Sequence, residues 1–561
     1  MSGAVPVGTT KGPGESPHTY TLVAPDADDQ LKIGEFVAYD ARVDGELRSV
    51  LGRIDARRPL KLYPDAFMAD PQVPPSRVAE LIGFDHATPE LYEFDVAVLG
   101  YFDDALGFVN PRVAPRAGRP VYLVPDDDLA HALSRNPHGK PGAAHVGSLL
   151  TRARDRVPIT LDMNEFASTH LAIIAGTGAG KSYLAGVIVE ELMQPSVGAA
   201  VVIVDPHGEY GTLEEIANHP GFRGEGYRAR TLVVRPEQIK IRRDLLHPSD
   251  IYQLVGSTHG LSGPQREVLR LALRAVGIDR GLRWTYRQLT EAVNDVELSG
   301  GPRNAGDEGA DYMLVKRALM WRLNATLGRQ DGIFDDYEHT SLQELIRPGQ
   351  CTVVQLNEVP REEQQVIAAT LLRRSFDGRV GTAKGRIGSG EEQHLPAPVF
   401  TLVEEAHHFA PASEEVPTTN LLKQILAEGR KFGFAVGLIS QRPGKLDQDV
   451  LSQCMTQCIL RVVNPVDQQA IAGAVESAGR ELLAELPALS KGQAIVAGAA
   501  VNTTVLCRVR PRLTPHGGES PDVVDAWRRA RSQLPPVDRS LEAADPESAR
   551  TPEERLFGSI Q

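Results

Sequence analysis

The sequence has few cysteines and no apolar run long enough to cross a bilayer. Its four cysteines, Cys351, Cys454, Cys458 and Cys507, are too few and too scattered for a disulfide framework. No second pair of ligands stands near Cys454 and Cys458 to complete a metal site. The N-terminus also lacks the hydrophobic core of a signal peptide. We therefore expect a reduced, cytoplasmic protein with no membrane anchor.

The sequence also has no excess of basic residues. The 561 residues include 73 acidic and 60 basic side chains, which gives a formal net charge of −13. This charge argues against a protein that coats nucleic acid with its whole surface, but it leaves room for binding through a local basic channel. Taken alone, the charge favours an enzyme that acts on small molecules.

Four regions follow one another along the chain. Residues 1–27 are rich in Gly, Pro, Ser and Thr and are predicted to be disordered. Residues 28–150 contain short β-like runs between turn residues, which predicts a small β-barrel. Residues 151–515 alternate apolar strands with helices, which predicts an α/β core with a parallel sheet and a helical insertion at about 212–345. Residues 516–561 are polar and proline-rich and are predicted to form a C-terminal tail with one helix.

A glycine-dense turn, AGTGAGKS at residues 175–182, lies between an apolar strand and an amphipathic helix. Backbone N–H groups in such a turn form a concave anion site at the start of the helix. Lys181 is placed to reach the β- and γ-phosphates of ATP, and Ser182 to bind Mg²⁺. The predicted nucleotide-binding residues are Gly176, Thr177, Gly178, Ala179, Gly180, Lys181 and Ser182.

An acidic pair follows a second apolar strand, in VFTLVEEAHHF at residues 399–409. Adjacent residues at a strand end point in different directions. We assign Glu404 to the Mg²⁺ side and Glu405 to activation of the attacking water. Glu404 stands where such motifs usually have Asp. His407 and His408 match no zinc spacing and are expected to pack or hydrogen-bond near the site.

Two further polar residues flank the strand in FGFAVGLISQRP, residues 432–443. Gln441 follows its carboxyl end, where ligands lie in open α/β sheets, and is predicted to sense the γ-phosphate. A simple strand-end cap is the alternative. Arg430 precedes the strand and is predicted to be an arginine finger supplied to a neighbouring subunit, with a plain surface arginine as the alternative.

These stretches resemble the HerA family of hexameric DNA translocases, in the HerA/FtsK branch of P-loop ATPases. The resemblance rests on AGTGAGKS, IVDPHGEYG (203–211), LVEEAHHFAP, the long run 428–471 and VRPRLTPHGG (509–518). It implies a RecA-like core behind a HAS-barrel-like domain, and a homohexameric ring around double-stranded DNA. It also implies a NurA-like nuclease or another effector, such as a Sir2-like protein, as partner.

The resemblance adds Asp205, in the DPHGEY stretch, as a residue near the nucleotide. It could hydrogen-bond to the Mg²⁺ shell, or it could cap a turn. The basic, glycine-rich segment 378–390 offers Arg379, Lys384 and Arg386 as pore contacts for phosphates, with a solvated surface loop as an equal alternative.

The leading hypothesis is an ATP-driven translocase that feeds duplex ends to a nuclease, in DNA-end resection or anti-phage defence. The alternatives are a conjugation or secretion ATPase of the VirB type, and a ring-shaped scaffold that activates a defence effector.

Overall fold

The chain divides into two compact units, residues 1–517 and 518–561. The computed structural model describes residues 5–13, 16–25, 29–60, 91–103, 105–224, 226–257, 260–297, 308–329, 332–475, 479–517 and 523–533. Within these ranges, no helix combines the length and the apolar character that a membrane span requires.

A closed β-barrel comes first. Its sheet runs in the order β2-β1-β7-β3-β4-β5-β6, and a further pairing between β2 and β5 closes it. Alternate residues of these strands point inward, so that Leu22, Val37, Ile54 and Phe94 form the barrel core. The strands are β1 Pro6–Pro13, β2 Thr19–Ala24, β3 Phe36–Val43, β4 Glu46–Pro59, β5 Tyr92–Asp103, β6 Gly107–Val109 and β7 Pro120–Leu123.

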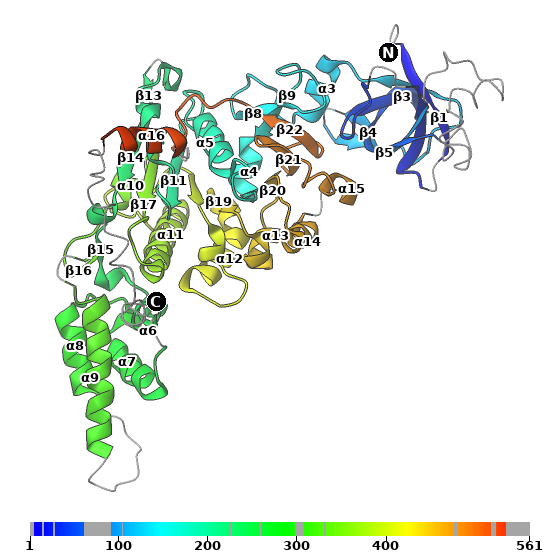
Figure 1. Ribbon diagram of the computed structural model, residues 1–561. Helices are drawn as coiled ribbons and strands as arrows, with labels where there is room; N and C mark the ends of the chain where they lie inside the picture. Colours follow the sequence, from blue (N-terminus) through cyan, green and yellow to red (C-terminus); the bar gives the residue numbers. More distant parts are fainter. Residues whose placement is uncertain are drawn as a thin grey trace, which may run out of the picture. The chain divides into compact units, whose positions relative to one another are not determined.

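The core is built on an 11-stranded sheet in the order β14-β17-β11-β18-β19-β10-β20-β21-β22-β8-β9 (Figure 1). The pairs from β14 to β20 are parallel, and the pairs from β20 to β9 are antiparallel. The strands are β8 Ala143–Leu149, β9 Pro158–Asp162, β10 Leu171–Ile174, β11 Ala200–Asp205, β14 Arg230–Val234, β17 Gln350–Gln355, β18 Val399–Val403, β19 Phe434–Ser440, β20 Thr456–Leu460, β21 Gln493–Gly498 and β22 Val505–Val509.

Helices cover both faces of the sheet. Val201 and Ile203 of β11 pack in the cluster that includes α5, whereas Val202 and Val204 pack in the cluster that includes α11. The helices are α3 Asp126–Leu133, α4 Met163–Thr169, α5 Lys181–Leu192, α6 Pro248–Gly256, α7 Gly263–Ala275, α8 Tyr286–Asp295, α9 Glu308–Thr326, α10 Leu342–Leu345, α11 Arg361–Ala383, α12 Pro417–Glu428, α13 Gln448–Ser452, α14 Pro465–Ala474, α15 Arg480–Leu483 and α16 Val523–Gln533.

The α/β core with an N-terminal barrel agrees with the fold class predicted from the sequence. Seven apolar runs of the sequence are predicted to form core strands, and they form β10, β11 and β17 to β21: LAIIA, AVVIVD, CTVVQL, VFTLVEE, AVGLIS, CILRVV and QAIVAG. The predicted helix near the C-terminus is α16, while residues 518–522 and 534–561 of the expected tail lie outside the described residues.

Three stretches of the expected organisation differ from the structure. Residues 6–13 and 19–24 form barrel strands instead of a disordered segment, because β1 finds hydrogen-bonding partners in β2 and β7. The barrel strands end at Leu123, and β8 within 28–150 belongs to the core sheet. In the expected insertion at 212–345, β14 joins the core sheet, and the α-helices start only at Pro248.

Within that region, α7, α8 and α9 pack against one another, as Figure 1 shows. Two short strand pairs accompany them, β12 Arg223–Gly224 with β13 Tyr227–Arg228, and β15 Ile241–Arg242 with β16 Phe334–Asp335.

Candidate functional site

The phosphate loop connects β10 to α5, and β10 is the central strand of the 11-stranded sheet. Strand β10 lies between β19 and β20, so its carboxyl end points into the edge where β18 and β19 also end. Gly178 and Gly180 adopt left-handed backbone angles, with φ of 74° and 108°. Most side chains are strained at such angles, which is why the turn is rich in glycine. The loop can therefore bring its N–H groups close to an anion.

Lys181 is buried at this edge among carboxylates. Its Nζ is ion-paired with Glu404 and lies 3.3 Å from Glu405 Oε1 and 3.6 Å from Glu209 Oε2. Burial by itself would lower the pKa of Lys181, but these carboxylates outweigh it, and the pKa is raised. Lys181 is therefore a fixed positive charge, and phosphates must compete with the carboxylates for it.

Glu404 and Glu405 are adjacent in sequence and differ in ionisation. Burial raises the pKa of Glu404 to about 7, although Lys181 and the Tyr210 hydroxyl, 2.5 Å from Glu404 Oε2, favour its charged form. Burial also acts on Glu405, but there Lys181 outweighs it and holds the pKa below its usual range. Glu405 is thus the ionised carboxylate of the pair near neutral pH, as activation of a water requires.

Glu405 is held in an uncommon backbone conformation, with a φ of 49°. Its Oε1 accepts a hydrogen bond from Gln441 Nε2, while its buried Oε2 has no hydrogen-bond partner among the described residues and lies 3.3 Å from His407 Nδ1. Gln441 also accepts a hydrogen bond from Thr177 of the phosphate loop at 3.0 Å. Gln441 therefore links the phosphate loop to Glu405, and its role as a γ-phosphate sensor stays a prediction.

Asp205 is the last residue of β11. Its carboxylate accepts hydrogen bonds from the backbone N–H groups of His207, Gly208, Glu209 and Tyr210, at 2.8 to 3.3 Å. These bonds favour a turn cap over a direct contact with the Mg²⁺ shell. The capped turn brings Glu209 to the Ser182 hydroxyl, which donates a hydrogen bond to it.

These residues fit ATP and Mg²⁺. The Ser182 hydroxyl and the carboxylates of Glu404 and Glu209 are the oxygen ligands that Mg²⁺ takes. Lys181 and the backbone N–H groups of the loop fit the phosphates. In the chain that the structure describes, no group of three or more His, Cys, Asp or Glu side chains is arranged for another metal ion.

Glu209 and Tyr210 also join the site. Both belong to the DPHGEY stretch, whose match to the family gave them no role, and they stand four and five residues after the cap Asp205. Their distance in sequence from Glu404, however, hides the contact, which only the neighbouring positions of β11 and β18 in the sheet create.

Arg430 lies at the opposite edge of the sheet. It stands in the 3₁₀ turn Gly429–Phe432, before the first residue of β19, whereas Gln441 follows the last. The seven residues of β19 separate the two by about 20 Å. Arg430 is exposed and is in no ion pair with any described residue. It therefore cannot serve the phosphate loop of its own chain.

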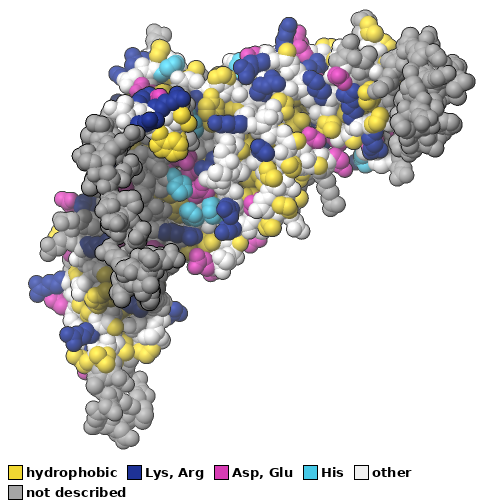
Figure 2. All heavy atoms as spheres, viewed as in Figure 1, with side chains coloured by type: hydrophobic (Ala, Val, Ile, Leu, Met, Phe, Trp, Pro, Cys, Tyr) yellow, Lys and Arg dark blue, Asp and Glu magenta, His cyan; other side chains and the backbone are white. Residues whose placement is uncertain are grey.

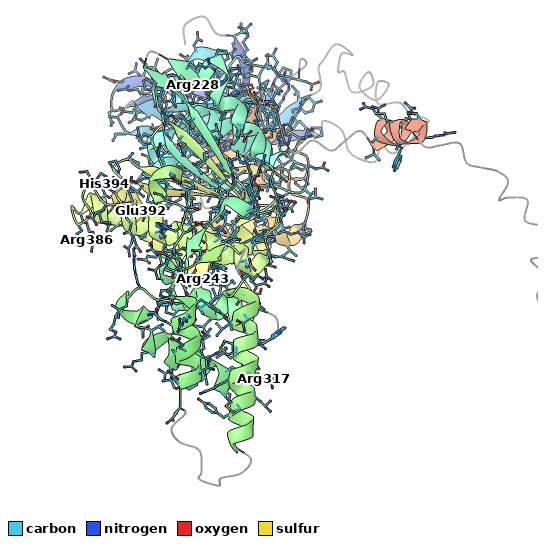
Figure 3. The ribbon with its side chains drawn as sticks, turned by 90° about the vertical axis from the view of Figure 1, so that its left-hand side faces the viewer. Arg228, Arg243, Arg317, Arg386, Glu392 and His394 are labelled. Atoms are coloured by element: carbon cyan, nitrogen blue, oxygen red, sulfur yellow. The ribbon has the colours of Figure 1, made fainter. Side chains whose placement is uncertain are left out.

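The basic segment 378–390 reaches the same edge as Arg430. Helix α11 extends to Ala383, so the segment begins as helix and not as a loop. Arg379 donates to the Leu395 carbonyl at 3.2 Å, and the Lys384 ammonium lies 5.0 Å from the Phe432 ring centre in the Arg430 turn. Figure 3 shows Arg386 on the outside of the core, near Glu392 and His394.

The C-terminal stretch of the core, VRPRLTPHGG, packs along α5. The buried Glu190 accepts hydrogen bonds from the N–H groups of Leu513 and Thr514, each at 2.9 Å, and pairs with Arg510. Arg510 also pairs with Glu191 at 2.7 Å. These contacts hold the helix that carries Lys181 and Ser182.

Comparison with known proteins agrees with this geometry. Residues 144–375 match the family model described as the central domain of helicase HerA. The DNA double-strand break repair helicase HerA of Pyrococcus furiosus is 30% identical over 469 residues, which are 76% of this chain and 80% of that protein. The chain belongs to the HerA helicase family. It is accordingly an ATP-hydrolysing enzyme of the helicase and translocase class.

Another HerA relative is the probable DNA double-strand break repair helicase HerA of Methanocaldococcus jannaschii, 28% identical over 79% of this chain and 90% of that protein. Among solved structures, VirB4 of Thermoanaerobacter pseudethanolicus has a TM-score of 0.45 at 13% identity, covering 66% of this chain and 97% of that one. The plasmid coupling protein TrwB with ADP and Mg²⁺ has a TM-score of 0.42 at 14% identity, covering 70% and 94%.

Proposed function

We propose that this HerA-family protein is an ATP-driven translocase or helicase of double-stranded DNA that works as a homohexameric ring. The observation that carries the proposal is the separation of Arg430 from the phosphate loop of its own chain. A site completed by Arg430 of a neighbour makes head-to-tail contacts, and such contacts close into a ring when the rotation between subunits allows it.

Each residue of the nucleotide site has its own proposed role. Bound ATP and Mg²⁺ supply the γ-phosphoryl group and the neutralising charge for its transfer to water. Ser182 and Glu404 hold the metal ion, and Lys181 with the loop from Gly176 to Gly180 holds the phosphates. Glu405 orients the attacking water through Oε2. Gln441 senses the γ-phosphate and is hydrogen-bonded to Glu405. The Arg430 of the next subunit stabilises the charge of the transition state.

A ring also accommodates the acidic composition of the chain. A central pore can hold DNA through phosphate contacts alone, while the outer surface stays acidic. We further propose a NurA-like nuclease or another effector as partner, since the curated relatives are described as double-strand break repair helicases.

One experiment tests the proposal. The ATPase rate of the purified full chain is measured with and without blunt duplex DNA, while light scattering gives the mass of the assembly under the same conditions. We expect a ring-sized assembly whose ATPase rate rises with duplex DNA. A chain that stays monomeric and ignores duplex DNA would refute the translocase. A ring that hydrolyses ATP but ignores DNA would favour the scaffold for an effector.

A further inference from the structure

A group of positively chargeable side chains lies directly beside Glu405. His407 Nδ1 is 3.3 Å from Glu405 Oε2, and His207 Nε2 is 3.9 Å from Glu405 Oε1. The ring centres of His407 and His408 are 4.4 Å apart, and those of His207 and His408 are 6.3 Å apart. Figure 2 shows His side chains gathered with Lys and Arg side chains near the middle of that face.

Two permanently charged side chains, Arg361 and Lys445, belong to the same group. Burial is the main cause that lowers the pKa of His407 to about 4 and also lowers that of His408, and the charges of Arg361 and Lys445 lower both further. Both cations therefore lie within electrostatic reach of the histidines. They are exposed, and neither is in an ion pair with any residue that the structure describes.

We propose that Arg361, Lys445, His207, His407 and His408 form a contact surface for backbone phosphates of the DNA duplex. The inference rests on the translocase function proposed above. Arg361 and Lys445 supply charge to the phosphates, and the three histidines supply ring N–H groups. We call these five residues the loop-edge surface.

Free space in front of Arg361 allows a strand to approach. Arg361 forms part of the wall of an open cavity of about 1040 Å³. The rest of that wall mixes arginines with Glu362, Glu414 and Glu415, so its charge has no single sign. The contact with phosphates is therefore assigned to the loop-edge surface and not to the whole cavity.

The loops that carry this surface are tied together and to the catalytic residues. Ala412 N–H donates to the Lys445 carbonyl, and Asp447 N–H to the Ala410 carbonyl, each at 2.9 Å. Gln365, one turn after Arg361 on α11, donates to the His408 carbonyl at 2.7 Å. A DNA phosphate bound to the loop-edge surface would therefore contact the loop segments that begin with Glu405 and Gln441. In this way the surface would couple DNA binding to activation of the water.

The two ends of α11 provide a matched comparison. Arg361 is the first residue of the helix and Arg386 follows its last turn, about 35 Å away by the rise of a 23-residue helix. Both arginines are exposed, and Arg386 belongs to the segment 378–390, the competing candidate for a phosphate contact. The experiment therefore compares Arg361→Ala, Lys445→Ala and their combination with Arg386→Ala, in the full chain, with a fluorescent blunt duplex at several salt concentrations.

Each lost phosphate contact should reduce the slope of log affinity against log salt by about 1. We expect this reduction for Arg361→Ala and Lys445→Ala, a larger one for the combination, and none for Arg386→Ala. At saturating DNA, the stimulation of the ATPase rate should fall in the first three variants. Arg361→Lys and Lys445→Arg keep the charge and should keep the wild-type slope, which separates charge from a folding defect.

Three results would overturn the loop-edge surface. The slope could stay unchanged in the alanine variants, or it could fall in Arg386→Ala instead. The variants could also fail to reach the wild-type assembly mass, which would make this surface a contact between subunits. A wild-type chain that binds no duplex would instead refute the translocase function itself, so the two failures are distinguishable.

Discussion

The two edges of the parallel part of the core sheet differ in how they hold their charged and polar side chains. At the carboxyl edge, the buried Lys181 pairs with the buried Glu404 and Glu405, and Gln441 donates a hydrogen bond to Glu405. At the amino edge, Arg430 is exposed and in no ion pair within the described part of the chain. The difference shows that Arg430 and the phosphate loop of the same chain cannot meet. In the ring proposed above, the carboxyl edge of one chain would meet the amino edge of the next.

The largest effect is expected from the carboxyl edge. Lys181→Ala removes the fixed charge for the phosphates and should lower ATP turnover by about 10³-fold or more, as loss of preorganised charge stabilisation does. Steady-state phosphate release measures it. Lys140→Ala, an exposed lysine outside the site, is the control. Normal turnover in Lys181→Ala would refute the assignment of the phosphate loop.

At the amino edge, Arg430→Ala should lower ATP turnover by about 10³-fold, because an arginine finger stabilises transition-state charge by that order. The adjacent exposed Lys431→Ala should be close to wild type. Mixing Arg430→Ala subunits with Glu405→Gln subunits should restore part of the activity, since some mixed interfaces then combine an intact carboxyl edge with an intact amino edge. If mixing restores nothing, the arginine does not act between chains.

A smaller loss of ATP turnover, about 10²-fold, is expected for Glu405→Gln, because this change keeps the shape of the side chain but removes its charge. This variant should still bind ATP, since the phosphate loop is unchanged. Single-turnover hydrolysis and a fluorescent nucleotide separate the two steps. Glu414→Gln, an exposed residue on the same loop, is the control. Brisk hydrolysis by Glu405→Gln would remove Glu405 from its proposed role.

The smallest effect concerns stability. The pKa of Glu404 is raised from 4.5 to about 7, so the folded chain holds an extra proton between these values. Stability from the protonated carboxyl is present below about pH 4.5 and is lost as the pH rises through about 7, by about 3 kcal/mol. Glu404→Gln should flatten this part of the profile in denaturant unfolding without nucleotide. An unchanged profile would contradict the buried, protonated Glu404.

The motif residues and most core strands could be predicted from the sequence because their signals are local. The turn around Gly178 and Gly180 needs left-handed backbone angles, and runs such as AVVIVD have the length and apolar character of buried strands. The predictions that were wrong also have a physical cause. Strand β1 looks like a loop in isolation, and only its pairing with β2 and β7 makes it a strand.

The sequence by itself determined the kind of chemistry: a phosphate loop with Lys181 and Ser182, an acidic pair after an apolar strand, and an α/β core behind a barrel. Tertiary structure alone decided which carboxylate stays ionised, that Glu209 and Tyr210 join the site, and that Arg430 lies at the opposite edge from its own nucleotide site. The reason is that charge, burial and the position of a strand end depend on neighbours that are distant in sequence.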